Sequence, residues 1–457
     1  MARDLLIQNA RVIDGSGSEP IERGCVLIEG GRISVVGPLD AVSAANRTDL
    51  RTLDATGLTV MPGMVDCHFH GVYQDVTCWE DYDLRRSIEH ATILAARNAQ
   101  TLLEVGFTSA RDTGTRGMVG IAVRDMINDG VLAGPRLLAG GQIITTTGGL
   151  ADGYGSWIDN RASLGRVVDG IEEVVKAVRE QVKYGAETVK LEASGTGISP
   201  YSDSRKQTMT VEEMAAAVKE AHRNGVRVAC HAQATESIKN AVRAGVDTVE
   251  HGSFLDEEGT ELMRQAGTVL VPTISVLDLY VTRGPDVGVP QWIVEKFEGD
   301  LVEHRQSVKM ALAAGIPMAV GSDSGHAFNP QSEIAYELEM MVDVGFTPME
   351  AIESATRIGA EVIGWENEIG QLSPGMFADL LVVDGNPLED VRMLRDPARL
   401  VSVYKEGVLV GGRAAPRRDE LELGYELAPR PAVSGGPDES DTIERPCCLK
   451  TSEELEH

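Results

Sequence analysis

The chain has 457 residues, of which 42% are hydrophobic and 25% charged, a composition typical of globular proteins. Its formal net charge of −28 argues against nucleic acid as a partner, because phosphate groups would be repelled. No apolar run approaches the roughly 18 to 20 residues of a membrane span, and six scattered cysteines without a visible secretory signal indicate a reduced, cytoplasmic protein.

Both ends of the chain read as β-structure. Residues 3–56 alternate short β-like runs with glycine-rich turns, and similar runs return at 378–387 and 400–412. We expect residues 1–57 and 366–414 to pair into one small β-sandwich domain. The polar remainder, 415–457, has little core of its own, so ordering it by packing on a neighbouring subunit would make the protein a homo-oligomer.

The middle of the chain, residues 58–365, alternates strand-like and helix-like segments. Helices are predicted at 171–185 and 211–225, where apolar residues recur at three-and-four spacing and a glycine follows the last turn. Eight strand–helix repeats predict an α/β fold, a (β/α)₈ TIM barrel, whereas a doubly wound open sheet lacks the expected glycine-rich phosphate loop. The predicted strands are 59–70, 107–112, 136–145, 187–194, 226–232, 248–253, 268–274 and 317–323.

Chemically active side chains gather where these strands end. In a barrel the C-terminal ends of the strands converge on one mouth, so residues there lie close together. The first pair alternates on one strand, which places both imidazoles on the same face. Imidazoles and a carboxylate suit zinc or a similar divalent ion with positions left open for substrate. The predicted set is His68, His70, Lys190, His231, His251 and Asp323.

The remaining histidines have other predicted settings. His90, His222 and His304 lie in helix-like segments, His326 lies in a loop, and His457 is the last residue of the chain. The predicted metal site therefore takes only histidines that stand where a strand stops.

Lys190 has two interpretations. An ammonium group cannot bind a metal, so the lysine could simply pair with Glu192 or Glu187. A lysine made neutral by burial can instead react with carbon dioxide, and the carbamate oxygens can bridge two metal ions. The sequence leaves both interpretations open.

The order HxH, Lys, His, His, Asp, followed by GMFADLLVVDGNPLEDV at 375–391, resembles the metal-dependent amidohydrolase superfamily. The likeness is strongest to the branch of prolidase-like enzymes, ochratoxin amidohydrolases, and phenylurea and thiocarbamate (molinate) hydrolases. The resemblance implies a first metal on His68, His70 and Asp323, a second on His231 and His251, and a carboxylated Lys190 bridge. One or two metals per chain are expected, zinc first, with cobalt, manganese or iron as alternatives.

The reaction that this resemblance implies is hydrolysis of an amide-like C–N bond of a small molecule. The metal would activate water at neutral pH. Asp323 would act as general base and then general acid, and His231 would help to polarise the substrate carbonyl. Alternatives are a dipeptidase (Xaa-Pro or Xaa-Arg type), an ochratoxin-type N-acyl amino acid amidohydrolase, a cyclic-amide hydrolase or deaminase, and a non-catalytic scaffold.

The substrate is predicted from the segments that follow the strands. Prolidase-like relatives carry a histidine in the loop after the third strand, where this chain has Leu150 in TTTGGLADGYG. Nine of the 20 aromatic residues fall in such segments and predict a ring-accepting pocket. Arg205 is the candidate for holding a free carboxylate. The nine aromatics are Tyr73, Trp79, Tyr82, Tyr154, Trp157, Tyr201, Phe254, Tyr280 and Phe328.

From these features we predict substrate contacts by Tyr154, Trp157, Tyr201, Arg205 and Phe254. The expected substrate is a neutral aryl amide, urea or carbamate, with an N-aryl urea such as a phenylurea herbicide as the sharpest version. The connection at 277–300 is expected to move on ligand binding in its first half and to begin a helix near Gln291.

Overall fold

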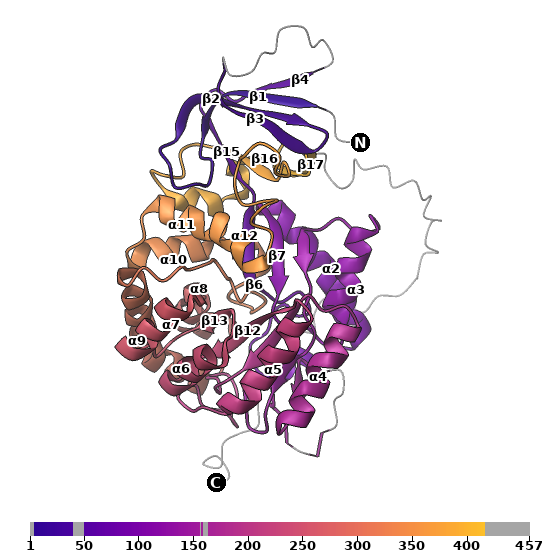
Figure 1. The fold of residues 1–457 in the computed structure, drawn as a ribbon, viewed down its shortest axis with the longest axis vertical. Helices are drawn as coiled ribbons and strands as arrows, with labels where there is room; N and C mark the ends of the chain where they lie inside the picture. Colours follow the sequence, from indigo (N-terminus) through magenta and orange to yellow (C-terminus); the bar gives the residue numbers. More distant parts are fainter. Residues whose placement is uncertain (1–3, 40–49, 156, 159–162, 416–457) are drawn as a thin grey trace, which may run out of the picture.

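The computed structural model describes residues 4–39, 50–155, 157–158 and 163–415 (Figure 1). Strands from both ends of the chain form a sheet at the top of Figure 1, and a larger body of helices and strands lies below it. None of the described helices is both long and apolar enough to cross a membrane. The polar tail that the sequence analysis singles out lies, beyond residue 415, outside the described residues.

The upper sheet contains eight strands in the order β17-β16-β15-β5-β1-β2-β3, with β4 paired to β1. Strand β5 joins the two chain ends because it pairs in parallel with β1 and antiparallel with β15. The eight strands form one continuous hydrogen-bonded sheet, and its division into two packed layers stays a prediction. The strands are β1 Leu5–Val12, β2 Ile21–Glu29, β3 Arg32–Pro38, β4 Arg51–Asp54, β5 Leu58–Pro62, β15 Leu380–Asp384, β16 Leu400–Lys405 and β17 Val408–Gly411.

Two parallel sheets form the centre of the larger body. One has the strand order β10-β9-β11-β12-β13-β14 and the other β6-β7-β8. The α/β class is therefore confirmed, but the described strands form no closed eight-stranded barrel. Their bounds are β6 Met64–Phe69, β7 Phe107–Asp112, β8 Arg136–Leu138, β9 Ile143–Thr145, β10 Gly165–Val167, β11 Thr188–Glu192, β12 Arg227–Ala232, β13 Thr248–His251 and β14 Val269–Val271.

The gap between the two sheets is spanned by the segment 317–323, which the sequence predicts as a strand. On one side, the backbone N–H of Leu270 in β14 donates to Pro317 O at 3.0 Å. On the other, the N–H of Cys67 in β6 donates to Val320 O at 2.8 Å. The segment thus lies where a strand was predicted, although within it only Met318 forms a β-bridge. At the other edge of the three-stranded sheet, Ala139 O, just after β8, accepts a hydrogen bond from Glu187 N, just before β11, at 2.8 Å.

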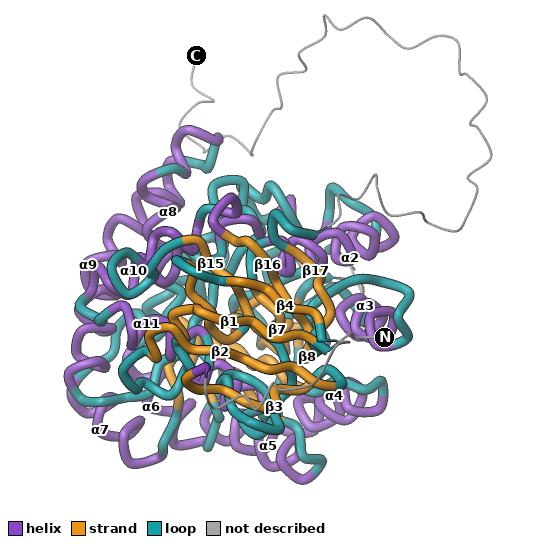
Figure 2. Tube along the Cα trace, turned by 90° about the horizontal axis from the view of Figure 1, so that it is seen from above, coloured by secondary structure: helices purple, strands orange, loops and turns teal. Residues whose placement is uncertain are grey.

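Helices surround these strands, as Figure 2 shows from above. Both predicted helices are present: α4 ends just before Gly185, and α5 begins at a capping box formed by Thr210 and Glu213. The helices are α1 Glu80–Asp83, α2 Ile88–Glu104, α3 Val119–Asn128, α4 Ile171–Lys183, α5 Val211–Arg223, α6 Thr235–Ala244, α7 Glu257–Ala266, α8 Ile274–Thr282, α9 Gln291–Ala313, α10 Tyr336–Val344, α11 Pro348–Ala355 and α12 Arg357–Ile363.

The connection after β14 differs from expectation in its first half. Helix α9 begins at Gln291 as predicted, but α8 and the short 3₁₀ helix Gly284–Val287 occupy most of the preceding segment. The buried carboxylate of Glu337 accepts hydrogen bonds from the first backbone amides of α8, Ile274 N at 2.8 Å and Ser275 N at 2.7 Å. This N-terminal anchor stabilises α8, which ends before the glycines and prolines of the connection.

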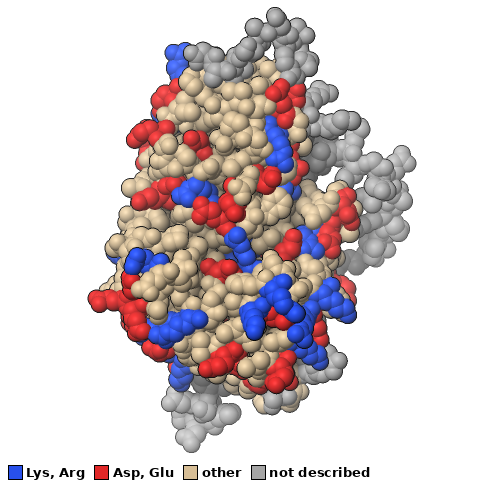
Figure 3. Space-filling model, viewed as in Figure 1, with Lys and Arg blue, Asp and Glu red and all other residues tan. Residues whose placement is uncertain are grey.

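The charged side chains are distributed over the visible surface. Figure 3 shows acidic and basic residues interspersed on one face, and many of the described ones are paired, such as Arg243 with Glu258 at 2.7 Å. On this face the excess of acidic residues is therefore not gathered into one patch.

Candidate metal centre

The predicted ligands come from neighbouring parallel strands. His68 lies in β6, Lys190 in β11, His231 in β12 and His251 at the end of β13, while Asp323 ends the segment 317–323. Because parallel strands present their C-terminal ends at one edge, these side chains converge. The ring centroids of His68 and His251 are 5.0 Å apart, and those of His231 and His251 are 4.6 Å apart.

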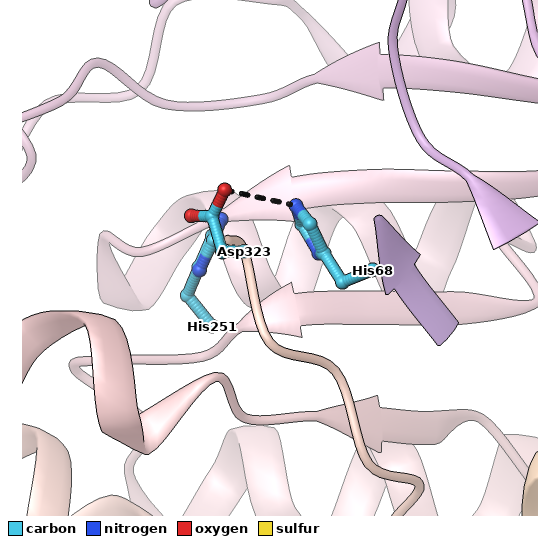
Figure 4. Close-up of side chains that lie close together, drawn as sticks. All are labelled: His68, His251 and Asp323. Carbon is cyan, nitrogen blue, oxygen red and sulfur yellow. Dashed lines mark ion pairs between the residues drawn. The ribbon is translucent and has the colours of Figure 1, made fainter. Parts of the chain in front are cut away.

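Three of these side chains form the tightest group. One ligand atom from each of His68, His251 and Asp323 lies within 4.8 Å of the others (Figure 4). Asp323 Oδ1 is 3.9 Å from His68 Nε2 and 3.5 Å from His70 Nε2. A carboxylate facing several imidazoles at these distances is a donor set that suits a divalent cation such as zinc.

Backbone carbonyls fix the orientation of two imidazoles. His70 Nδ1 lies 2.8 Å from Gly114 O, and His231 Nε2 lies 3.0 Å from Gly195 O. A carbonyl oxygen only accepts, so these ring nitrogens carry the proton and donate it. The other nitrogen of each ring is left with a free lone pair, as a metal ligand requires.

His68 is oriented by a buried ion pair that the sequence analysis missed. Its Nδ1 lies 2.7 Å from Glu250 Oε2, and Glu250 Oε1 accepts from Arg111 Nη2 at 2.8 Å. Arg111 is buried and also donates to Cys67 O at 2.7 Å. A carboxylate behind a ligating histidine fixes its tautomer and raises its basicity. Glu250 stands directly before His251, but sequence alone does not show which of the two faces inward.

His251 is held by a hydroxyl and by an unusual backbone. Its Nδ1 lies 2.7 Å from Thr273 Oγ1, which leaves Nε2 free. His251, Thr273 and Asp323 all have positive φ angles, of 69°, 49° and 46°. Such conformations are costly for residues other than glycine and are concentrated at functional sites.

Burial sets the protonation of these groups. It lowers the pKa of His70 and of His231 to about 3, and that of His68 and His251 well below the ordinary value. All four imidazoles are therefore neutral near pH 7 and able to bind a cation. Burial raises the pKa of Asp323 to about 7, so this carboxyl group exchanges its proton in the neutral range.

Lys190 does not form the ion pairs considered from sequence. Its Nζ is buried and has no hydrogen-bond partner, and burial lowers its pKa to about 8. Glu192 instead accepts a hydrogen bond from Thr145 Oγ1 at 2.5 Å, and Glu187 pairs with Arg124 at 2.7 Å. An unpartnered, easily deprotonated amine among neutral imidazoles and a carboxylate fits a bridging role between metal ions.

A cavity opens in front of these side chains. Together with its open mouth it contains about 610 Å³ of empty space. Lys190 is the only lysine or arginine among its described lining residues, and Leu150 is part of its wall. The lining comprises His68, His70, Tyr73, Trp79, Tyr82, Ile143, Leu150, Leu164, Lys190, Thr196, Ile198, His231, Gln233, His251, Val276, Leu277, Tyr280, Phe297, Asp323 and His326.

Stacked rings form one wall of the cavity. Four of the nine mouth aromatics, Tyr73, Trp79, Tyr82 and Tyr280, line it. His326, which the sequence analysis left in a loop, lies 2.9 Å through Nε2 from the Tyr82 hydroxyl. Its ring stacks on Phe328, with centroids 5.1 Å apart. The position of His326 three residues after Asp323 is the only sequence signal for this role.

The five predicted substrate contacts lie outside the cavity lining. Trp157 is 81% exposed and Tyr201 56% exposed, so both rings face solvent. The Tyr154 hydroxyl donates to the carboxylate of Asp83. Tyr154 packs behind the wall, with its ring centroid 6.3 Å from that of Trp79.

Arg205 and Phe254 form a separate contact. The Arg205 guanidinium lies 4.1 Å from the centroid of the Phe254 ring and pairs with Asp300 at 2.9 Å. Arg205 lines a different surface groove, together with Tyr201 and Lys296. Because its charge is already compensated, it is poorly placed to bind a carboxylate at the metal centre.

Comparisons with known proteins agree with this geometry. Residues 59–410 match the Amidohydrolase family. Ochratoxinase from Aspergillus niger is 30% identical over 433 residues, which cover 90% of this chain and 87% of that protein. The structure of a Xaa-Pro dipeptidase with bound methionine is 33% identical, with a TM-score of 0.81 and coverage of 89% of this chain and 99% of that chain.

A more distant similarity concerns the fold alone. Phenylurea hydrolase B is 22% identical, with a TM-score of 0.71 over 89% of this chain and 96% of that chain. The resemblance inferred from the order of ligands and from the segment 375–391 is confirmed by the family match, which covers the parallel sheets and all six predicted ligands. The chain belongs to the amidohydrolase family, and is a hydrolase of C–N bonds.

Proposed function

We propose that this enzyme is a metal-dependent hydrolase of neutral, ring-bearing amides. The observation that carries this proposal is the cavity wall, which joins apolar and aromatic side chains to one convergent set of neutral imidazoles. Among the described residues that line it there is no arginine, and Lys190, the only lysine among them, lies within the ligand set. A substrate with a free carboxylate would find no uncommitted cation among these residues.

The ligand assignment follows the resemblance and fits the donor set. His68, His70 and Asp323 would hold one divalent ion, and His231 and His251 a second, with carboxylated Lys190 between them. Zinc suits these nitrogen and oxygen donors best, and cobalt, manganese or iron could replace it. Such an ion, when bound, polarises a carbonyl group and lowers the pKa of water.

The protein's own groups have defined tasks. Asp323, with a pKa of about 7, can take a proton from water and return it to the leaving amine. His231 is better suited to ligation than to polarising the substrate carbonyl, since its N–H already donates to Gly195 O. The aromatic wall would hold the substrate ring and exclude water.

Two substrate classes are compared with the cavity. N-aryl ureas and carbamates are neutral and ring-bearing, so they remain within the proposed class. The second candidate is an N-acyl amino acid or a dipeptide, which the names of ochratoxinase and Xaa-Pro dipeptidase suggest at 30% and 33% identity. For that substrate the carboxylate would have to reach Arg205 in the neighbouring groove.

Architecture, assembly and location complete the proposal. The two parallel sheets and the segment 317–323 are consistent with a (β/α)₈ barrel, supported by the hydrogen bonds on both sides of the gap between the sheets. Cys67 and Cys230 are buried thiols, and a cytoplasmic location stays the expectation from the sequence. A homo-oligomer remains the expected assembly.

Catalytic efficiency on matched substrates tests the function. N-acyl anilines, N-aryl ureas and carbamates should be cleaved with higher kcat/KM than dipeptides and N-acyl amino acids of the same size, with metal content measured alongside. A preference for the carboxylate-bearing substrates that disappears in Arg205→Ala would establish the second candidate instead.

A further inference from the structure

One polar side chain in the cavity wall has no role in the proposed metal centre. Gln233 follows β12, two residues after His231, and its side chain is 3% exposed. It lines the cavity, and its Oε1 has no hydrogen-bond partner. A buried amide oxygen without a partner is costly, so its retention in the cavity wall requires an explanation.

The position of Gln233 is rigid. Its backbone N–H donates to Ser194 Oγ at 2.9 Å, and its carbonyl accepts from Phe254 N at 3.0 Å, which ties it to the ends of both neighbouring strands. Its side-chain Nε2 lies 3.4 Å from Ser253 Oγ. With the amide nitrogen directed to this hydroxyl, Oε1 is left as a buried acceptor without a partner among the described residues, in a side chain that lines the cavity.

Besides Gln233 Oε1 and Lys190 Nζ, two atoms of the lining have no hydrogen-bond partner among the described residues. These are Trp79 Nε1, which only donates, and His326 Nδ1. His326 Nδ1 faces the backbone of Asp323, and its ring is bound to Tyr82 on the other side. Gln233 Oε1 is therefore the free acceptor that stands beside a predicted metal ligand.

The distance from the metal centre suits an amide nitrogen. Along an extended chain, Gln233 lies roughly 7 Å beyond His231 and on the same side. A substrate carbonyl directed at the imidazoles places its amide nitrogen one bond further out, toward the mouth. An N–H there would point at the surrounding wall and needs an acceptor.

We propose that Gln233 Oε1 accepts the N–H of the scissile amide and so makes the enzyme selective for secondary amides over tertiary ones. This inference rests on the proposed amide hydrolysis and deepens it. A bond to a proline nitrogen has no N–H, so it would leave Oε1 unpartnered in the complex and would be disfavoured. Anilides, N-aryl ureas with a free N–H and N-acyl primary amines are the favoured substrates.

The test compares an N-acyl aniline with its N-methyl derivative in three forms of the protein. In the unsubstituted enzyme the secondary amide should be preferred. Gln233→Met should lower kcat/KM for the secondary amide by roughly ten- to hundredfold and leave the N-methyl amide within about threefold. Gln265→Met, the same change on an exposed face of α7, should alter neither value. Taking ratios between proteins cancels the intrinsic reactivity of the two amides.

Failure of this inference differs from failure of the proposed function. Parallel losses on both amides in Gln233→Met, or an unchanged ratio, overturn the role of Gln233 while leaving amide hydrolysis in place. If the unsubstituted protein cleaves neither amide, the proposed function fails. In that case, calorimetry on the binding of an N-aryl phosphonamidate and its N-methyl counterpart tests the role of Gln233 without turnover. A preference for N–H that disappears in Gln233→Met supports the inference, and equal binding by the unsubstituted protein overturns it.

Discussion

Lys190 offers the most direct test of the proposed metal centre, because a protonated amine cannot bind a metal ion whereas the proposed carbamate can. The side chain is 2% exposed, and Nζ has no partner among the described residues. In metal-free protein without carbon dioxide this amine is a buried cation at neutral pH, and the nearby carboxylates of Glu250 and Asp323 offset only part of the cost of its burial. We expect Lys190→Met, which keeps the length of the side chain but removes the charge, to raise the stability of that form.

The magnitude follows from the pKa. Burial lowers it from the ordinary value of 10.5 to about 8, a difference that corresponds to roughly 3 kcal/mol. Below pH 8 both the folded and the unfolded chain carry the charge, and the folded state bears the full cost. Between pH 8 and 10.5 the folded state binds fewer protons than the unfolded chain, so stability rises with pH. Above 10.5 both are neutral and the cost is gone.

Urea unfolding of the metal-free proteins between pH 7.5 and 10.5 measures this effect. Lys190→Met should exceed the unsubstituted protein by about 3 kcal/mol at pH 7.5, and the difference should shrink toward zero near pH 10.5. Titrating groups remote from Lys190 are common to both proteins and cancel in the difference, whereas the pKa of Asp323, which Lys190 lowers, should rise in Lys190→Met. Lys219→Met, on the exposed face of α5, should change stability by less than about 0.5 kcal/mol at every pH.

The same substitution should abolish activity. Lys190→Ala should also be inactive, with part of its turnover restored by short-chain carboxylic acids that supply the two missing oxygens. The reasoning would be refuted if Lys190→Met kept its metal and full activity. A metal-free Lys190→Met that is less stable than the unsubstituted protein at pH 7.5 would show that the amine has a partner.

Other substitutions probe the remaining parts of the site. Replacing His251 by Ala should remove metal, measured by atomic absorption, and lower turnover by more than about a thousandfold. Glu250→Gln weakens the hydrogen bond behind His68, so metal affinity in a chelator competition should fall roughly ten- to hundredfold; unchanged affinity would show that the ion pair is only structural. Arg205→Ala should leave kcat/KM for neutral amides within about twofold, and a large loss would place the substrate in the neighbouring groove. Burial raises the pKa of Glu337 to about 7, so its stability contribution is lost as pH rises from 4.5 through 7; in Glu337→Gln this decline, followed by thermal unfolding, should be smaller.

Local patterns in the sequence determined most of the helices and strands. The three-and-four spacing before Gly185 and Gly225 corresponds to α4 and α5, and the run at 107–112 corresponds to β7, because side-chain periodicity is a property of the chain itself. The ligand candidates were recognisable for the same reason, since each stands where an apolar run stops. The pairing of strands was harder to predict from the sequence. Segment 317–323 lies between the two sheets where a strand was predicted, but within it only Met318 forms a β-bridge.

Only the tertiary structure decided which residues face the metal centre and which do not. Tyr154 and Arg205 lie in segments that follow strands, as Tyr73 does, but their side chains pair with Asp83 and Asp300 and do not line the cavity. Such contacts join residues about 70 to 95 positions apart, and no local pattern records them.

The residues next to the predicted ligands were equally difficult to predict from the sequence. Glu250 lies behind His68, Glu192 turns away from Lys190, and Gln233 keeps a free acceptor in the cavity wall. Residue types and spacing indicated which groups could bind a metal, because coordination depends on chemistry at strand ends. The direction of each neighbouring side chain depends on partners from other strands, and these are settled only when the sheets assemble.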